Sequence, residues 1–199
     1  MFVAASSRCF ADLPLDAAMR QLVDLEFSHV EVFLHERDGH IKPSEVYDDF
    51  DRAAGDLYYR QFAACCKLAK AAKVVTMTVR AGELGTPYNQ EVERLRALVA
   101  LATIEGVRVG LLTEVGRMTE DPATAAVLCD TVKGLGITLD PSHYIFGPRG
   151  GVNYDMIFRH TIHIRLRDTT RDRLQVRVGQ GEVEYGRLIA QLGRYHYNR

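Results

Sequence analysis

Residues able to do acid–base or metal chemistry recur in this sequence where short apolar runs end. Carboxylates, imidazoles and guanidinium groups are all represented: His35, Arg80, Glu114, Asp140, His143, His163 and Arg165. In folds built from parallel strands and helices, ligands bind beyond the carboxyl ends of the strands. Two carboxylates and two imidazoles that meet at one such edge predict a site for a divalent metal.

The sequence around Asp140 indicates a functional site more strongly than the sequence around Glu114 does. Glu114 ends the apolar run that starts at Val107, so it either faces the mouth of the fold or is a capping or salt-bridged glutamate. Asp140-Pro-Ser-His143 places a carboxylate at a strand tip and an imidazole one turn later, on a segment stiffened by Pro141. The alternative for this motif is a helix-capping aspartate followed by a surface histidine.

A third motif, from His163 to Asp168, alternates charged and apolar residues. The alternation puts His163, Arg165 and Arg167 on one face of a strand. Because a buried unpaired charge is costly, these arginines either bind a ligand or form a lattice with acidic neighbours. A glycine pair follows at Gly179-Gln-Gly181, where backbone N–H groups could cradle an anion, although the motif lacks the context of a nucleotide-binding loop.

The elements that must position these residues alternate along the chain. Short apolar or β-branched runs predict strands at residues 2–6, 29–34, 74–79, 107–114, 136–140 and 161–166. Helical spacing of apolar residues predicts helices at 15–25, 42–54, 58–72, 91–104, 122–133 and 183–192. This alternation indicates an α/β fold with a parallel sheet and right-handed crossovers.

The count of strands falls short of a complete barrel. Too few residues separate the helix that ends near Ala54 from the helix that starts near Tyr58 to supply a third strand, and the chain stops at Arg199, just after a helix. An eight-stranded barrel usually needs about 250 residues, whereas this chain has 199. We therefore expect one domain, residues 1–199, that is a TIM barrel without evident third and eighth strands.

Composition narrows the choice of partner and compartment. The formal charge is −1, which disfavours a nucleic-acid partner, but residues 140–199 hold ten arginines, no lysine and six acidic residues. This arginine-rich third suits a small anionic ligand. The four cysteines lack metal-binding spacing, and no run predicts a signal peptide or a membrane span. We expect a cytoplasmic protein with a small-molecule ligand, no membrane partner and possible homo-oligomers.

The motifs, taken in order, resemble the xylose isomerase-like TIM barrels, a superfamily of sugar-phosphate isomerases and epimerases that also contains metal-dependent apurinic endonucleases. The resemblance covers nearly the whole chain and rests on residues 6–8, 30–33, 112–114, 139–143, 163–168 and 179–182. It implies a divalent metal, Mn, Mg, Zn or Co, held by Glu114, Asp140 and His163. His143 would then contact the substrate. From their places after predicted strands, we also expect Arg165 and His35 to bind substrate.

The sequence departs from this family at two places. The second of two alternating histidines in the family's strand motif is replaced here by Arg165, and the second glutamate ligand belongs to the eighth strand, which is not evident. The resemblance implies an isomerase or epimerase of carbohydrate metabolism that acts on a small sugar, sugar phosphate or polyol ketone, with Glu114 as base. The alternatives are a non-catalytic sugar-binding barrel, an inosose-type dehydratase and, less favoured by charge, an apurinic endonuclease.

Overall fold

The computed structural model describes residues 3–46, 57–147 and 149–197. The chain divides into two compact units, Met1–Ala72 and Lys73–Arg199. The expected end of the second helix, and part of the stretch in which a third strand was sought, fall at residues 47–56 and lie outside the described residues. No described helix is both long and apolar enough to span a lipid bilayer.

The first unit contains two short parallel strands and several helical segments. They are β1 (Ala5–Ser6), η1 (Ser7–Phe10), α1 (Leu15–Asp24), β2 (Val30–Glu31), α2 (Pro43–Val46) and α3 (Leu57–Ala71). Ala5 of β1 lies in register with Val30 of β2. His40 ties this unit together, because its ring nitrogens lie 3.0 Å from Ser7 Oγ and 3.1 Å from the carbonyl oxygens of Phe10 and Leu13.

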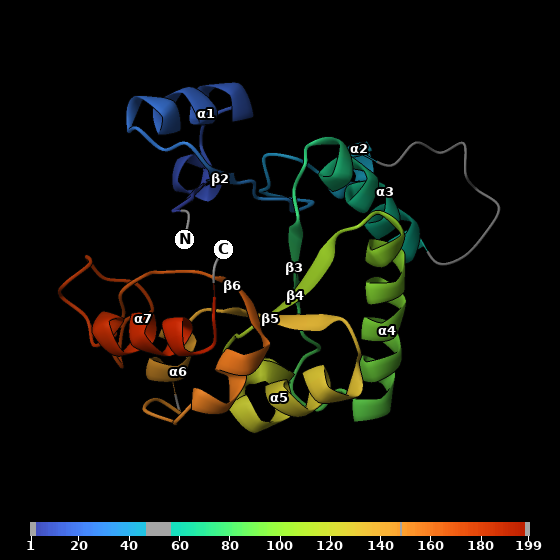
Figure 1. The fold of residues 1–199 in the computed structure, drawn as a ribbon. Coiled ribbons are helices and arrows are strands. Elements are labelled where there is room, and N and C mark those ends of the chain that lie inside the picture. The colour runs from blue at the N-terminus through green and yellow to red at the C-terminus, as the bar shows by residue number, and fades with distance from the viewer. Residues whose placement is uncertain (1–2, 47–56, 148, 198–199) are drawn as a thin grey trace. The chain divides into compact units, whose positions relative to one another are not determined.

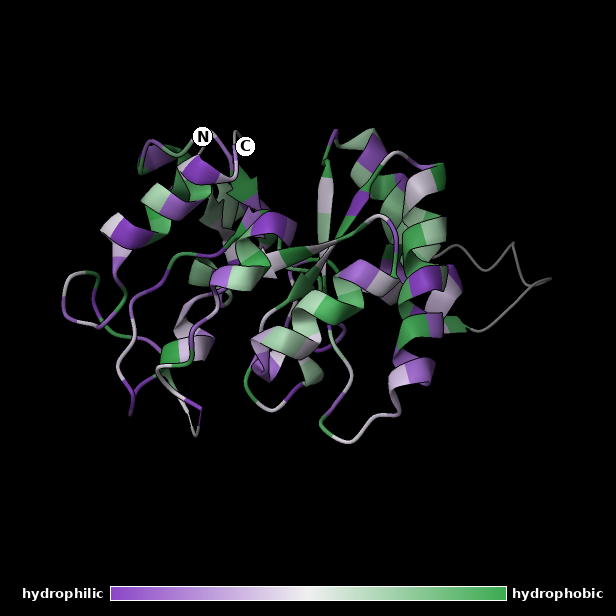
Figure 2. Ribbon diagram, turned by 60° about the horizontal axis from the view of Figure 1, so that its bottom comes forward, coloured by the Kyte–Doolittle hydropathy of each residue, from purple (hydrophilic) through white to green (hydrophobic). Residues whose placement is uncertain are grey.

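The second unit contains a four-stranded parallel sheet in the order β3-β4-β5-β6 (Figure 1). Its strands are β3 (Thr76–Arg80), β4 (Arg108–Leu112), β5 (Leu135–Leu139) and β6 (Thr161–Ile164). Its helical segments are α4 (Tyr88–Ile104), η3 (Met118–Glu120), α5 (Pro122–Thr131), α6 (Ser142–Ile145), η4 (Asp155–His160) and α7 (Tyr185–Arg194). The hydropathy colouring shows hydrophobic residues along the strands of this sheet (Figure 2).

The strand and helix pattern of the sequence is confirmed in its main features. Each of the six expected strands overlaps a strand of the structure, and the paired strands are parallel. Over the described residues the strands form two sheets and no closed barrel. The short segments η1, η3, α6 and η4 were not expected, because they are too short to show an apolar period.

The local sequence explains where the central elements begin. All five residues of β5 are buried, as expected for a strand covered on both faces. Helix α5 begins after Asp121, whose carboxylate accepts a hydrogen bond from the Thr124 amide at 3.0 Å, and Pro122 occupies its first turn. These signals end the loop before α5 and direct the chain back along the sheet.

One position on the sheet must be glycine because of a contact between its neighbours. The hydroxyl groups of Thr78 on β3 and Thr138 on β5 lie 2.9 Å apart, on either side of β4. A Cβ atom on Gly110 of β4 would overlap Thr138 Oγ1. The missing side chain therefore lets a polar hydrogen bond cross the middle strand.

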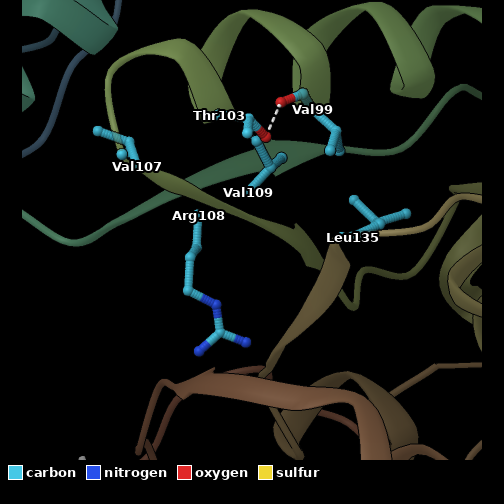
Figure 3. A pocket seen from close by; sticks show the side chains of 8 residues that line it. Val99, Thr103, Val107, Arg108, Val109 and Leu135 are labelled. Atoms are coloured by element: carbon cyan, nitrogen blue, oxygen red, sulfur yellow. Dashed lines mark hydrogen bonds between the residues drawn. The ribbon is translucent and has the colours of Figure 1, made fainter.

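A cavity of about 380 Å³ lies at the amino ends of the strands (Figure 3). Its lining includes Val99 and Thr103 of α4, Val109 of β4 and Leu135 of β5. In the close-up, the Arg108 side chain extends away from the other labelled side chains. The cavity lies at the end of β4 opposite to Glu114, so it is not the site that the sequence indicates.

We expect Gly110→Ala to lower the free energy of unfolding by roughly 1–3 kcal/mol, because the added methyl group displaces Thr138 and breaks its bond to Thr78. Chemical denaturation measures this loss. Gly186→Ala in α7 is the matched control, since a Cβ there meets no atom within 4 Å, and it should be neutral or slightly stabilising. Equal stabilities for the two variants would contradict the crossing hydrogen bond.

Candidate functional site

Five polar side chains form a cluster at the carboxyl edge of the parallel sheet, here called the carboxyl rim: Arg80, Glu114, Asp140, His143 and Arg167. Arg80 is the last residue of β3, Glu114 lies two residues beyond β4, and Asp140 follows β5 directly. Because β3, β4 and β5 are parallel and adjacent, their carboxyl ends meet at this edge. The topology thus brings the two predicted carboxylates together.

Two buried threonines hold the backbone that carries the carboxylates. Thr113 Oγ1 accepts a hydrogen bond from the Asp140 amide at 2.8 Å and donates to the Asp140 carbonyl at 3.1 Å. Thr119 Oγ1 donates to the Leu112 carbonyl at 2.7 Å and accepts from the Glu114 amide at 3.2 Å. The carboxylates therefore start from a backbone whose buried polar groups are paired.

Glu114 forms a bidentate ion pair with Arg80. Nε and Nη2 of Arg80 lie 2.7 Å and 2.6 Å from the two carboxylate oxygens of Glu114. Burial would raise the pKa of Glu114, but Arg80, with smaller contributions from His143 and Arg117, lowers it overall. Glu114 is therefore salt-bridged where its strand ends, and its partner Arg80 has a side chain that is 57% exposed.

Asp140 is held by Ser142 and Arg167. Its Oδ1 accepts hydrogen bonds from the amide and hydroxyl groups of Ser142 at 3.1 Å and 2.5 Å. Its Oδ2 lies 2.7 Å from Nη2 of Arg167, and Arg167 Nε donates to Ser142 Oγ at 2.8 Å. Asp140 is buried, so the pair with Arg167 supplies the counter-charge that burial demands.

His143 lies between two hydrogen-bond donors. The Val115 amide lies 3.2 Å from Nδ1 of His143, and Nη2 of Arg167 lies 2.7 Å from Nε2. A neutral imidazole has one N–H group and one acceptor nitrogen, so it accepts a hydrogen bond from one of these donors at a time. Removal from water, and then the charge of Arg167, lower the pKa of His143 despite the opposing effect of Asp140. His143 is therefore a neutral imidazole held beside a guanidinium group.

The remaining predicted site residues are His163, Arg165 and His35. His163 is on β6, in register with Thr138, and the amide of Arg165 donates to the Leu139 carbonyl at 2.9 Å just beyond that strand. The charge of Arg165 helps to lower the pKa of His143. His35 belongs to the first unit, where it pairs with Asp38 and its ring stacks on Phe33 at 5.8 Å between centroids.

The expected metal ligands are not arranged for a cation. Within the described ranges, no three histidine, cysteine or acidic side chains form a group that could hold a metal ion, and Glu114, Asp140 and His163 are no exception. The four carboxylate oxygens of Glu114 and Asp140 already accept hydrogen bonds, from Arg80, Ser142 and Arg167. This donor set does not fit Mn, Mg, Zn or Co without displacement of two arginines.

The glycine pair after β6 does cradle an anion, and that anion is the carboxylate of Asp168. Amide groups of Thr169, Gly179, Gly181 and Val183 donate to it over 2.8–3.3 Å. A Cβ atom on Gly181 would overlap Asp168 Oδ1. Burial would raise the pKa of Asp168, but these four N–H groups lower it overall. The motif orders the loop that leads from Arg167 to α7.

Sequence reasoning assigned no role to several residues that organise the carboxyl rim. Ser142 and Thr113 gave no signal, because their function depends on contacts between separate strands. Tyr185 was also missed. Its hydroxyl oxygen is buried and has no hydrogen-bond partner among the described residues, and burial, Asp168 and Asp140 together raise its pKa. Tyr185 therefore keeps a neutral hydroxyl group that is electrostatically coupled to Asp140.

Comparisons with known proteins identify the fold. No family model matches the sequence, and no curated protein matches it. A D-tagatose 3-epimerase-like protein is similar in structure, with a TM-score of 0.76 and 16% identity over 100% of this chain and 88% of that one. A xylose isomerase-like TIM barrel protein from Mycobacterium smegmatis, in complex with magnesium, is also similar. Its TM-score is 0.74, with 13% identity over 97% of this chain and 86% of that one.

A third similar structure is the probable 3-DHS dehydratase AsbF from Bacillus anthracis, with a TM-score of 0.73 and 14% identity over 98% of this chain and 89% of that one. At such identities the likeness concerns the fold. The chain thus has the fold of the xylose isomerase-like TIM barrels, as its motifs predicted.

We expect Asp168→Asn to lower the free energy of unfolding at neutral pH by roughly 1.5–3 kcal/mol, since charge-assisted hydrogen bonds are lost. The folded-state pKa of Asp168 is depressed, so its stabilisation is present above the unfolded value of about 3.9 and is lost as pH falls through the folded value. Denaturation curves measured from pH 7 down to pH 3 should therefore converge for the two proteins. A constant difference over that range would contradict the assignment.

Proposed function

We propose that this protein is a sugar isomerase or epimerase that moves a proton at the carbon next to a carbonyl group of a small sugar, sugar phosphate or polyol ketone. The observation that carries the proposal is the carboxyl rim, where the carboxylate of Glu114 and the neutral imidazole of His143 share one edge of the sheet. Similar structures, which include a 3-keto-D-glucoside 4-epimerase and an L-ribulose 3-epimerase, support the same class. The free cysteines suit a reducing cytoplasm.

The proposed reaction has two proton transfers. Glu114 removes the proton from the carbon next to the carbonyl, the C–H electron pair forms the double bond of an enediolate, and negative charge collects on the former carbonyl oxygen. The N–H groups of Arg167 stabilise that oxygen, and His143 contacts the substrate beside it. If solvent delivers a proton to the other face and Glu114 releases its own proton to solvent, the product is an epimer. If Glu114 returns its proton to the neighbouring carbon and the hydroxyl proton passes from one oxygen to the other, the product is an isomer.

The ion pair with Arg80 controls the base. While Arg80 is bound, the pKa of Glu114 is low and the carboxylate is a weak base. Arg80 is more than half exposed, so a substrate group can draw its guanidinium away from Glu114. A phosphate or carboxylate of the substrate is the natural competitor, because a guanidinium binds such groups through two parallel hydrogen bonds. Arg165 remains a proposed contact to the rest of the substrate.

A dehydratase is the second candidate, favoured by the likeness to the probable 3-DHS dehydratase AsbF. Its first step is the same removal of a proton next to a carbonyl group. The enediolate or enolate then expels a neighbouring hydroxyl group as water instead of taking back the proton. A non-catalytic sugar-binding protein would perform neither step.

Solvent deuterium exchange tests the proposal. The protein is incubated in D₂O with a panel of ketohexoses, their phosphates and 3-keto sugars, and NMR follows deuterium at the carbon next to the carbonyl. We expect exchange on at least one compound and a loss of roughly 100-fold or more in Glu114→Gln. An epimerase returns deuterated epimers, whereas a dehydratase accumulates an unsaturated product.

Glu93→Gln is the matched control, because Glu93 is an exposed glutamate whose carboxylate pairs with Arg96 within α4. It should exchange like the wild type. Full activity in Glu114→Gln would remove Glu114 as the base, and no exchange with any compound would favour the non-catalytic alternative.

A further inference from the structure

We propose that Arg167 is the resident cation of the carboxyl rim and replaces a divalent metal there. The inference deepens the proposed function, because it names what would face the substrate oxygen. Its test measures ion binding rather than turnover, so either statement can fail while the other holds.

The first step concerns the oxygens of Asp140. A metal ligand needs a free oxygen, yet Oδ2 of Asp140 lies 2.7 Å from Arg167 Nη2 and Oδ1 accepts from Ser142. The same Nη2 lies 2.7 Å from His143 Nε2. One guanidinium nitrogen therefore lies within hydrogen-bond distance of both an acidic and an imidazole side chain, which is where a cation shared by these two ligands would be.

The second step concerns the permanence of that contact. Arg167 is 28% exposed, and its Nε also donates to Ser142 Oγ at 2.8 Å, so three side chains hold it. A guanidinium keeps its charge at every pH at which the protein is folded. An entering metal would have to break these hydrogen bonds and leave a partly buried positive charge without its carboxylate.

The third step concerns the surrounding charge. Arg80 binds both oxygens of Glu114, the charge of Arg117 lowers the pKa of Glu114, and the charge of Arg165 lowers that of His143. With Arg167 beside Asp140, four guanidinium groups therefore act on Glu114, Asp140 or His143. Coulomb repulsion from these arginines opposes the binding of a divalent metal ion, whereas the same charges attract an anionic group of the substrate.

The test is a titration of the full chain with Mn²⁺ alone after treatment with a chelator, followed by calorimetry and by the electron paramagnetic resonance of free Mn²⁺. We expect the wild type to bind Mn²⁺ more weakly than about 1 mM. Arg167→Met, which frees Asp140 Oδ2 and His143 Nε2, should bind Mn²⁺ at least about tenfold more tightly. Arg167→Lys keeps a positive charge and should stay close to the wild type.

The matched control is Arg187→Met, which breaks the ion pair of Arg187 with Asp155 on another part of the same unit and should not gain Mn²⁺ affinity. One equivalent of Mn²⁺ bound by the wild type at micromolar concentration would overturn the proposal, and this result needs no variant. A folded Arg167→Met, judged by circular dichroism, that gains no affinity would overturn it as well.

Discussion

The ion pair between Asp140 and Arg167 is the interaction on which the rest of the site depends. Asp140 is almost fully buried, and a buried carboxylate without a partner costs roughly 3–5 kcal/mol. The guanidinium of Arg167 supplies the opposite charge and at the same time contacts Ser142 and His143. The end of β5, the α6 turn and the segment after β6 therefore meet at one planar group, and Asp168, directly after Arg167, anchors the following loop.

The two carboxylates of the carboxyl rim are held in different ways, and the difference separates their roles. Asp140 is paired inside the protein and has no freedom to change partners. Glu114 is paired with Arg80, whose side chain is mostly in solvent and can turn toward a ligand at little cost. A buried anchor beside a carboxylate with a removable partner is the arrangement that an acid–base site requires, because one group keeps the geometry while the other changes its proton affinity.

Much of the fold could be predicted from the sequence, because β-branched runs and helical spacing are local signals. The runs at 74–79 and 136–140 become β3 and β5, and Asp121-Pro122 starts α5 as capping rules require. The place of Glu114 and Asp140 at one edge followed from parallel topology alone. The partners of these carboxylates could not be predicted in this way. The ion pairs with Arg80 and Arg167 depend on side-chain contacts between separate strands, which no local sequence pattern indicates. For the same reason, the sequence did not show that arginines occupy the carboxylate oxygens of the expected metal ligands.

The central claim is that Asp140 and Arg167 stabilise each other, and a double-mutant cycle measures this directly. The free energy of unfolding is determined for the wild type, Asp140→Asn, Arg167→Met and the double variant. The account predicts a coupling energy of at least about 1 kcal/mol, with the double variant more stable than the sum of the single losses implies. Losses that add to within roughly 0.3 kcal/mol would show that the two side chains do not interact, and would contradict it.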